Sequence, residues 1–154
     1  MNRIHVPISP LIPDSGRPSL GMLATTLIIR RKRVRVLIDS GADGDLAIDM
    51  SAAQRLRLTQ TPVEDYASSV GGKVSLSRLH LKTVRVEGSP VVLSIIAGAV
   101  IDLSSLKTIG PFDGILGSWF LWRYRAVLNY GRQTLTISTT PRVARFSQLA
   151  ECEQ

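Results

Sequence analysis

The chain has 154 residues, of which 44% are hydrophobic and 20% are charged, and its formal net charge is +7. This length and composition predict one globular domain with a core of its own, and they exclude a disordered or fibrous chain. The longest apolar run, Val91 to Ile101, is interrupted by Ser94 and is too short to span a bilayer. We therefore expect no membrane partner.

The few histidine and cysteine residues give no sign of a metal or a cofactor. His5, His80 and Cys152 form no pair at metal-ligand spacing, and Gly71-Gly72-Lys73 lacks the rest of a phosphate-binding loop. A single cysteine rules out a disulfide framework within the chain, and the N-terminus lacks the apolar core of a signal peptide. We expect no cofactor and a location inside the cell.

Residues 1–19 contain four prolines and no sustained hydrophobic period, which predicts an extended arm or linker. This arm includes Asp14-Ser15-Gly16. No strand pattern leads into that triplet, so we interpret it as a turn.

Two strands are predicted next, over Leu20 to Ile29 and over Arg33 to Ile38, because apolar and β-branched residues dominate the first and alternate with charges in the second. The turn between them is strongly basic. Such a cluster suits a solvated turn or a nucleic-acid patch, and we favour the turn because no aromatic residue interleaves with the charges. Nucleic acid is not an expected partner. The basic residues are Arg30, Arg31, Lys32, Arg33 and Arg35.

After the second strand, Leu46 to Ile48 predicts a short strand and Asp49 to Leu58 a short helix, with Asp49 or Ser51 as its N-cap. Pro62 is expected to close that unit. The apolar side of this helix is formed by Ala52, Ala53 and Leu56.

Residues 66–81 predict a hairpin whose tip is Val70-Gly71-Gly72-Lys73, and we expect this tip to be mobile because it has few apolar residues. Beyond it, the apolar phase switches between Leu81 and Val84, which predicts a bulge near Lys82-Thr83. Val91 to Ala97 is a continuous apolar run that is typical of a buried strand. Residues 98–111 form a connection without an assigned structure.

The last part of the domain repeats the pattern of apolar residues running into a glycine, at Ile115-Leu116-Gly117. A short helix is predicted over Ser118 to Tyr124, with Ser118 as N-cap. A hairpin over 126–138 follows, and residues 139–154 form a tail. At least seven short strands and two short helices predict an all-β domain or closed barrel over residues 20–138.

The most informative stretch is the strand that runs straight into Asp39-Ser40-Gly41. A carboxylate at the end of an apolar strand is costly unless it is hydrogen-bonded or held for chemistry. Two such carboxylates that share a proton can act as general base and general acid. Asp113 precedes its apolar pair and is interpreted as a structural residue. One chain then supplies one acid, and a two-fold homodimer would supply the pair.

At this point the sequence resembles the retropepsin-like (retroviral-type) aspartic proteases. The loop Leu37-Ile38-Asp39-Ser40-Gly41-Ala42-Asp43 is similar to their active-site loop, and Ile115-Leu116-Gly117 is similar to their second hallmark before a short helix. Gly71-Gly72 falls where the family has a glycine-tipped flap. The resemblance implies a closed acid-protease barrel with one lobe per chain, and an aspartic endopeptidase that cleaves a peptide or polyprotein substrate as a homodimer.

The resemblance also implies a role for each matching residue. Asp39 would be catalytic, activating water and protonating the leaving amine, and Ser40 and Gly41 would complete the active-site loop. The implied substrate-binding residues are Ala42, Asp43, Gly71 and Gly72, and the implied loop support is Ile115, Leu116 and Gly117.

Two positions depart from the family pattern, since Ser118 stands where viral members often have arginine and Trp119 where many relatives have an acid or amide. Two other functions stay open from the sequence alone. One is a catalytically inactive retropepsin-like module for dimerisation or peptide binding. The other is a nucleic-acid-binding β-barrel that uses the basic cluster at residues 30–35.

Overall fold

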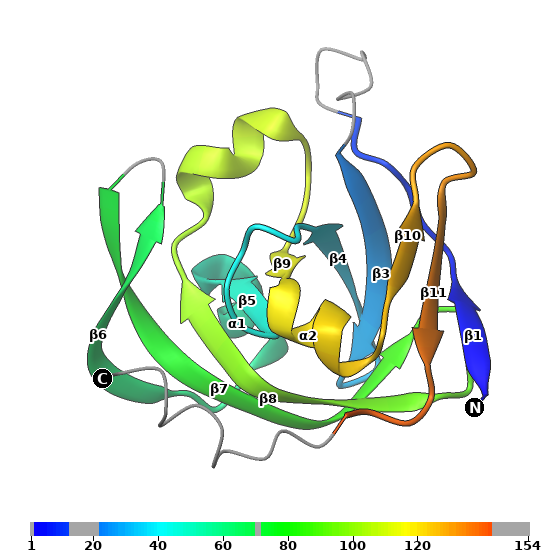
Figure 1. Cartoon of the computed structure of the whole chain (residues 1–154). Helices are drawn as coiled ribbons and strands as arrows, with labels where there is room; N and C mark the ends of the chain where they lie inside the picture. The colour runs from blue at the N-terminus through cyan, green and yellow to red at the C-terminus, as the bar shows by residue number, and fades with distance from the viewer. Residues whose placement is uncertain (1, 13–21, 70–71, 143–154) are drawn as a thin grey trace, which may run out of the picture.

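The computed structural model describes residues 2–12, 22–69 and 72–142 (Figure 1). Strands dominate these residues, and the helices are short, which confirms the all-β prediction. In chain order the elements are β1 (Arg3–Val6), β2 (Ser9–Pro10), β3 (Leu23–Ile29), β4 (Lys32–Ile38), β5 (Leu46–Asp49), α1 (Met50–Leu56), β6 (Thr61–Ser69), β7 (Gly72–Val86), β8 (Val92–Ile101), η1 (Ser104–Ile109), β9 (Gly114–Leu116), α2 (Ser118–Arg123), β10 (Val127–Asn129) and β11 (Thr134–Ser138).

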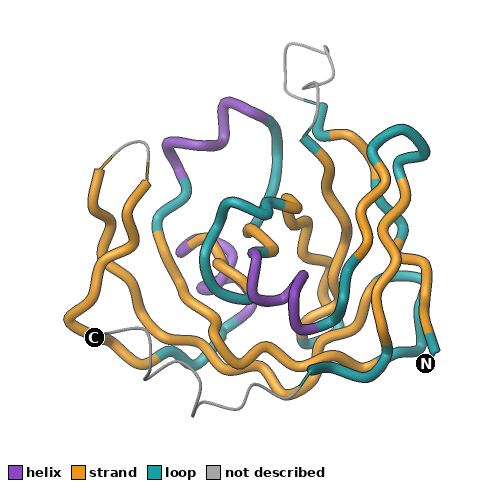
Figure 2. The backbone as a smooth tube through the Cα atoms, in the orientation of Figure 1, coloured by secondary structure: helices purple, strands orange, loops and turns teal. Residues whose placement is uncertain are grey.

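The larger sheet closes into a barrel (Figure 2). Its strand order is β2-β3-β4-β9-β5-β8-β7-β6, and β3 pairs in addition with β7, so the six strands from β3 to β7 in that order form a ring. Most neighbours are antiparallel, whereas β4 pairs with β9 and β5 with β8 in parallel. Closure leaves few unpaired strand edges. The predicted closed barrel is confirmed.

The barrel core is built from strands that alternate between an inner and an outer face. In β4, Val34 and Val36 are fully buried while Arg33 is exposed and Arg35 is half-buried. This period of two is the pattern from which the strand was predicted. Helix α1 covers one end of the core with its small apolar side, Ala52, Ala53 and Leu56, as the sequence predicted.

The basic cluster forms the turn between β3 and β4, where Arg30 and Arg31 have φ values of 50° and 63°. Its side chains reach the last turn of α1. The Arg30 guanidinium donates a hydrogen bond to the carbonyl oxygen of Arg57, and Lys32 Nζ lies 3.0 Å from the carbonyl oxygen of Arg55. Cations at the C-terminal end of a helix satisfy carbonyls that have no partner within it. The interpretation of this cluster as a turn is confirmed.

A second, three-stranded sheet has the order β1-β11-β10. Residues 3–6, which the sequence placed in an extended arm, are extended but are paired with β11 as part of this sheet. Leu11 is also buried, at 1% exposure. The first residues are therefore a packed element and not a free linker. The proposed turn at 14–16 lies outside the described residues, and the domain boundaries at 20 and 138 stay a prediction.

Several local predictions were wrong in detail. Asp49 is the N-cap residue of α1, as predicted, but its side chain makes no cap hydrogen bond, and the helix ends at Leu56 instead of Leu58. Gly117, and not Ser118, is the N-cap of α2. Pro62 lies inside β6, near a register shift, instead of closing a unit.

The predicted buried run from Val91 to Ala97 also needs correction. Val92 and Ile96 are each 55% exposed, and the strand continues to Ile101 through part of the predicted connection. By contrast, the register of β7 against β8 shifts between Leu81 and Val84, so the predicted bulge is confirmed.

Candidate active site

The loop that carries Asp39 begins where β4 ends, and its first turn is held by hydrogen bonds to β9 and within the loop. The Asp39 amide donates to the carbonyl oxygen of Leu116 at 3.0 Å, and the Ala42 amide donates to the carbonyl oxygen of Asp39 at 3.2 Å. The Gly41 amide donates to Asp39 Oδ1 at 2.8 Å. Within the described residues Asp39 Oδ2 accepts no hydrogen bond, so the loop orients the carboxylate through Oδ1 alone.

Helix α2 supports the rest of this loop through its first amides. The amide of Gly117 donates to the Asp45 carbonyl at 3.0 Å, that of Ser118 to the Ala42 carbonyl at 2.8 Å, and that of Trp119 to the Gly44 carbonyl at 3.0 Å. The first amides of a helix have no partner within it, so the loop and the helix complete each other. Figure 1 shows this loop in front of β9 and beside α2.

Gly117 permits this close approach because it has no side chain. A Cβ atom at this position would lie 2.5 Å from the carbonyl oxygen of Gly44 and 2.8 Å from that of Ala42. Carbon atoms do not approach oxygen that closely, so either the loop or the helix would have to shift. The side chains of Ser118 and Trp119, which depart from the family pattern, take no part in these bonds, since only their amides are used.

A buried ion pair fixes the far end of the loop. Asp45 Oδ2 lies 2.8 Å from Nη2 of Arg123 and accepts the amides of Ile96 and Ala97 at 2.8 and 2.9 Å. Arg123 Nη2 also donates to the carbonyl oxygen of Ser94 at 2.6 Å. The loop, α2 and β8 are therefore joined at one carboxylate.

Sequence reasoning missed this pair. One signal was present, because Arg123 lies three residues after Phe120 and next to Tyr124, on the apolar side of a short helix. A cation on that side requires a buried acid as its partner.

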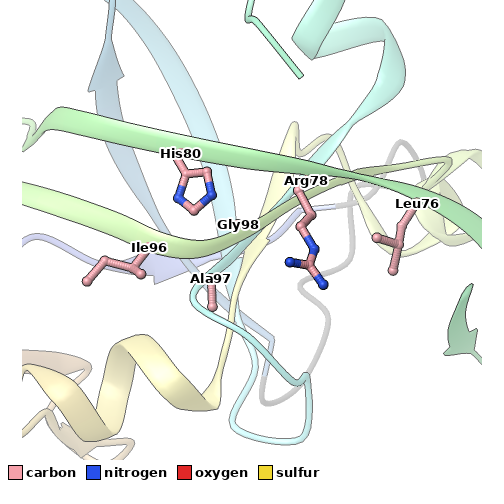
Figure 3. A pocket seen from close by; sticks show the side chains of 6 residues that line it. All are labelled: Leu76, Arg78, His80, Ile96, Ala97 and Gly98. Carbon is pink, nitrogen blue, oxygen red and sulfur yellow. The ribbon is translucent and has the colours of Figure 1, made fainter. Parts of the chain in front are cut away.

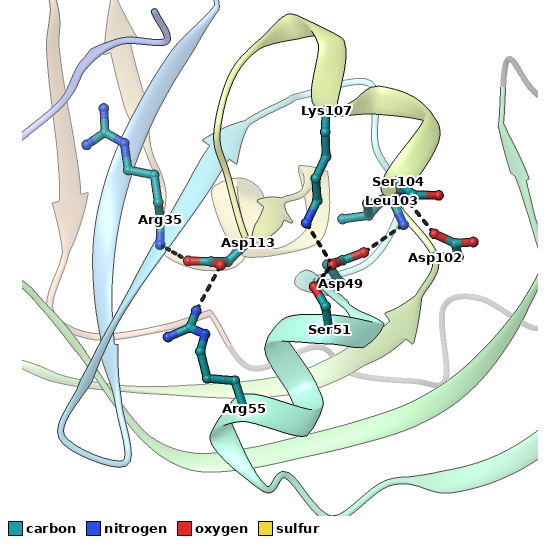
Figure 4. Close-up of polar contacts among 9 residues, drawn as sticks. All are labelled: Arg35, Asp49, Ser51, Arg55, Asp102, Leu103, Ser104, Lys107 and Asp113. Atoms are coloured by element: carbon teal, nitrogen blue, oxygen red, sulfur yellow. Dashed lines mark hydrogen bonds and ion pairs between the residues drawn. The ribbon is translucent and has the colours of Figure 1, made fainter. Parts of the chain in front are cut away.

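Two further carboxylates hold structural positions around the site (Figure 4). Asp113 Oδ2 accepts the Arg35 amide at 3.0 Å, and its Oδ1 lies 2.8 Å from Nη2 of Arg55. These contacts confirm the interpretation of Asp113 as a structural residue. It links β4 to helix α1.

The second of these carboxylates, Asp49, ties η1 to the start of α1 (Figure 4). Its Oδ1 accepts the Leu103 amide at 3.0 Å, and its Oδ2 lies 2.9 Å from Nζ of Lys107 and accepts the Ser51 hydroxyl. Burial acts to raise the pKa of Asp49, but the hydrogen bonds from Ser51, Lys107 and Leu103, with the charge of Lys107, outweigh it and lower the pKa below its ordinary value of 3.8.

The other residues singled out from the sequence lie on three elements. Ser40 and Asp43 are exposed on the loop, where the Asp43 carboxylate accepts the Gly44 amide at 2.9 Å. Ile115 and Leu116 are buried in β9, directly beside β4. The structure thus brings the Asp39 loop, β9 and α2 together.

Gly72, one of the two glycines predicted for the flap, lies in the hairpin of β6 and β7. Gly72 is the first residue of β7, pairs with Ser69 and has a φ of 109°. Gly71 and the rest of the expected tip lie outside the described residues, so the mobility of the tip stays a prediction.

Among the described side chains, no group of three or more His, Cys, Asp or Glu residues could hold a metal ion. In the described part of the chain, no helix has the length and apolar character needed to cross a membrane.

Comparisons with known proteins agree with this geometry. The family model described as aspartyl protease matches residues 25–120, which include the Asp39 loop, β9 and the start of α2. The chain therefore belongs to the aspartyl protease family, and its fold is that of the retropepsin-like members. A search of the curated proteins found no match.

Solved structures with the same fold come from distant sources. A retropepsin-like aspartic protease from Rickettsia conorii is 17% identical, with a TM-score of 0.54, and the alignment covers 89% of this chain and 99% of that one. EIAV protease, solved with the inhibitor HBY-793, is 23% identical, with a TM-score of 0.53 and coverage of 69% and 90%. The retroviral protease-like domain of Ddi1 from Leishmania major is 22% identical, with a TM-score of 0.52 and coverage of 77% and 90%.

Proposed function

We propose that this protein is an aspartic endopeptidase whose active site is formed by two copies of the chain. The observation that carries the proposal is the Asp39 loop, in which one carboxylate oxygen accepts the Gly41 amide and the other accepts no hydrogen bond from the described residues. The sequence has one Asp-Ser-Gly triplet that follows an apolar strand, at residues 39–41. The second carboxylate therefore comes from the same loop of a second copy.

Two aspartates that face each other cannot both ionise easily, so they share one proton. The ionised Asp39 removes a proton from water, which attacks the carbonyl carbon of the scissile peptide bond. The protonated Asp39 of the other copy first hydrogen-bonds the carbonyl oxygen. Collapse of the tetrahedral intermediate breaks the C–N bond, and the leaving amine takes a proton from the pair.

The neighbouring residues bind and orient the substrate. Ser40 braces the two loops across the dimer, and Gly41 lies against the peptide backbone. Ala42 and Asp43 line the path of the substrate, where the exposed Asp43 side chain holds the peptide main chain. The peptide binds as an extended strand, with apolar side chains flanking the scissile bond.

The flap and the loop support complete the proposed site. Gly71 and Gly72 let the hairpin of β6 and β7 close over the bound peptide. The buried Ile115 and Leu116 of β9, with Gly117 at the start of α2, hold the Asp39 loop in position.

The exposed edge of the three-stranded sheet is an observation in favour of the proposed homodimer. Strand β10 is at the edge of the order β1-β11-β10, and Val127 on this strand is 50% exposed. Two aromatic residues close to it in sequence, Trp122 and Tyr130, are 45% and 57% exposed. An edge strand with exposed apolar neighbours is a surface on which a second chain can pair.

The experiment that tests the function is a cleavage assay on a mixture of unfolded proteins. The wild-type chain should cleave the mixture and be blocked by a statine-type transition-state mimic, and Asp39→Asn should remove the activity. Glu87→Gln is the matched control, because it makes the same acid-to-amide change at an exposed pair with Arg33. Full activity of Asp39→Asn would exclude the mechanism. Absence of cleavage by a folded wild-type dimer would instead favour an inactive dimerisation or peptide-binding module.

A further inference from the structure

A pocket of about 340 Å³ opens on one face of strands β7 and β8 (Figure 3). Side chains of both strands point into it. Its size falls in the range of pockets that bind small ligands, and it can hold one or two amino-acid side chains. The lining residues are Leu76, Arg78 and His80 from β7 and Ile96, Ala97 and Gly98 from β8.

An irregularity in the strand pairing shapes this pocket. Leu79 pairs with Gly98 and Leu81 with Ile95, so His80 alone stands opposite both Ile96 and Ala97. Such a bulge turns side chains away from their regular alternation and is common beside active sites. Ile96 is 55% exposed on the same face as Val92, and the exposed Ala97 beside it marks the change of phase that the bulge causes.

The pocket is bonded directly to the Asp39 loop. The amides of Ile96 and Ala97 donate to Asp45 Oδ2, and the Asp45 amide donates to the carbonyl oxygen of Ala97 at 2.8 Å. A Cβ atom on Gly44 would lie 3.0 Å from that same carbonyl oxygen. The wall of the pocket and the end of the loop are therefore in contact.

Two basic side chains line the pocket without a polar partner among the described residues. Arg78 and His80 are exposed, and neither side chain has a hydrogen-bond or ion-pair partner among the described residues. The nearest acid bonded to the pocket wall, Asp45, is already paired with Arg123. A guanidinium group beside the apolar Leu76 and Ile96 matches a carboxylate on an aliphatic stem.

We propose that this pocket binds an acidic side chain, glutamate or aspartate, of the extended peptide, and that Arg78 determines this specificity. The proposal rests on the proposed function for its substrate class, but the pocket is separate from the Asp39 carboxylate. It adds a preference for acid at a position away from the scissile bond, beyond the apolar flanking residues.

Peptide retention tests the pocket without catalysis. The full chain with Asp39→Asn is immobilised and incubated with a random decapeptide library, and the retained peptides are sequenced. We expect Asp and Glu to be enriched at one position by about threefold to tenfold, the size of one charge-assisted contact that is partly open to solvent. Adding Arg78→Glu should replace this enrichment by one of Lys and Arg.

The matched control is Arg85→Glu, which makes the same charge change at an exposed position of β7 outside the pocket lining. It should leave the acidic preference unchanged. Arg78→Gln is a second variant, which should remove the preference without reversing it. Thermal unfolding of each variant checks that the substitution has not altered the fold.

The outcomes separate this proposal from the proposed function. No retained peptides, retention without acidic enrichment, or the same preference in the Arg78→Glu and Arg85→Glu proteins would overturn the pocket assignment. Cleavage by the wild-type chain without any acidic preference would do the same and leave the protease function standing. Acidic retention that depends on Arg78, with no cleavage by the wild-type chain, would overturn the protease function only.

Discussion

Nη2 of Arg123 lies 2.8 Å from Oδ2 of Asp45, and both side chains are more than nine-tenths buried. This pair joins α2 to the end of the loop that begins at Asp39. We expect Arg123→Leu to lower the free energy of unfolding by about 3–5 kcal/mol, because it leaves the Asp45 carboxylate buried without its counter-ion. Urea unfolding at a fixed protein concentration measures this change.

The exposed pair of Arg33 and Glu87 provides the control for that measurement. Its atoms are also 2.8 Å apart, but the two side chains are 72% and 42% exposed. Arg33→Leu should therefore cost about 0–1 kcal/mol. Equal losses for Arg33→Leu and Arg123→Leu would show that burial of the Asp45 pair carries no special cost.

Gly117 is the position where the helix and the loop are closest. Gly117→Ala places a methyl group within 2.5–3.1 Å of three loop carbonyl oxygens, and we expect it to destabilise the protein by about 1–3 kcal/mol. Cleavage activity should fall as well, because the loop that moves carries Asp39. Thermal unfolding and the cleavage assay measure the two effects. Gly131→Ala, where the nearest atom is 3.6 Å away, should change neither.

The lowered pKa of Asp49 predicts a pH dependence of stability. A carboxyl group whose pKa is lower in the folded state stabilises that state above its unfolded pKa, near 3.8 here, and the contribution is lost as the pH falls through the folded value. Asp49→Asn should therefore cost more stability at pH 7 than at pH 3. Urea unfolding at both pH values gives the difference.

Glu64→Gln serves as the reference for that comparison, since it makes an acid-to-amide change at an exposed position of β6 and should have only a small effect on stability. An Asp49→Asn penalty that stays constant from pH 7 to pH 3 would contradict the assigned role of its hydrogen bonds with Ser51, Lys107 and Leu103.

A site shared by two chains predicts that activity depends on protein concentration. Activity per chain should fall on dilution below the dissociation constant of the dimer, because each separated chain keeps only one Asp39. Analytical ultracentrifugation at the same concentrations should show the monomer appearing in parallel. An undiminished specific activity in a sample shown to be monomeric would rule out the shared site.

Much of the fold followed from local patterns in the sequence. The alternation of Val34 and Val36 with charged residues predicted β4, and the phase switch between Leu81 and Val84 predicted the bulge of β7. Such signals depend on a few neighbouring residues, and they are readable wherever one face of an element is buried. The loop at Asp39 was found in the same way, from an acid and a glycine at the end of an apolar strand.

Contacts between distant segments could not be read in this way. Asp49 or Ser51 was predicted as the helix cap, and Asp49 is the N-cap residue, but its carboxylate binds the amide of Leu103 and the ammonium of Lys107 instead of an amide of the helix. The exposure of both Ile96 and Ala97 depends on the bulge in the pairing of β7 with β8, and the ion pair of Asp45 with Arg123 depends on the closed barrel. A local sequence pattern contains no information on either of these long-range contacts.

Besides the Asp45–Arg123 pair, the Asp39 loop is supported by main-chain groups, with the carbonyls of Ala42, Gly44 and Asp45 bound to the first amides of α2. Every amino acid except proline supplies the same amide, so this support places few demands on side chains apart from the missing one at Gly117. The side chains at these amide positions can therefore vary, as Ser118 and Trp119 illustrate, while the main-chain bonds are kept. A fold held in this manner can persist in sequences as divergent as the 17–23% identity of the three structural neighbours.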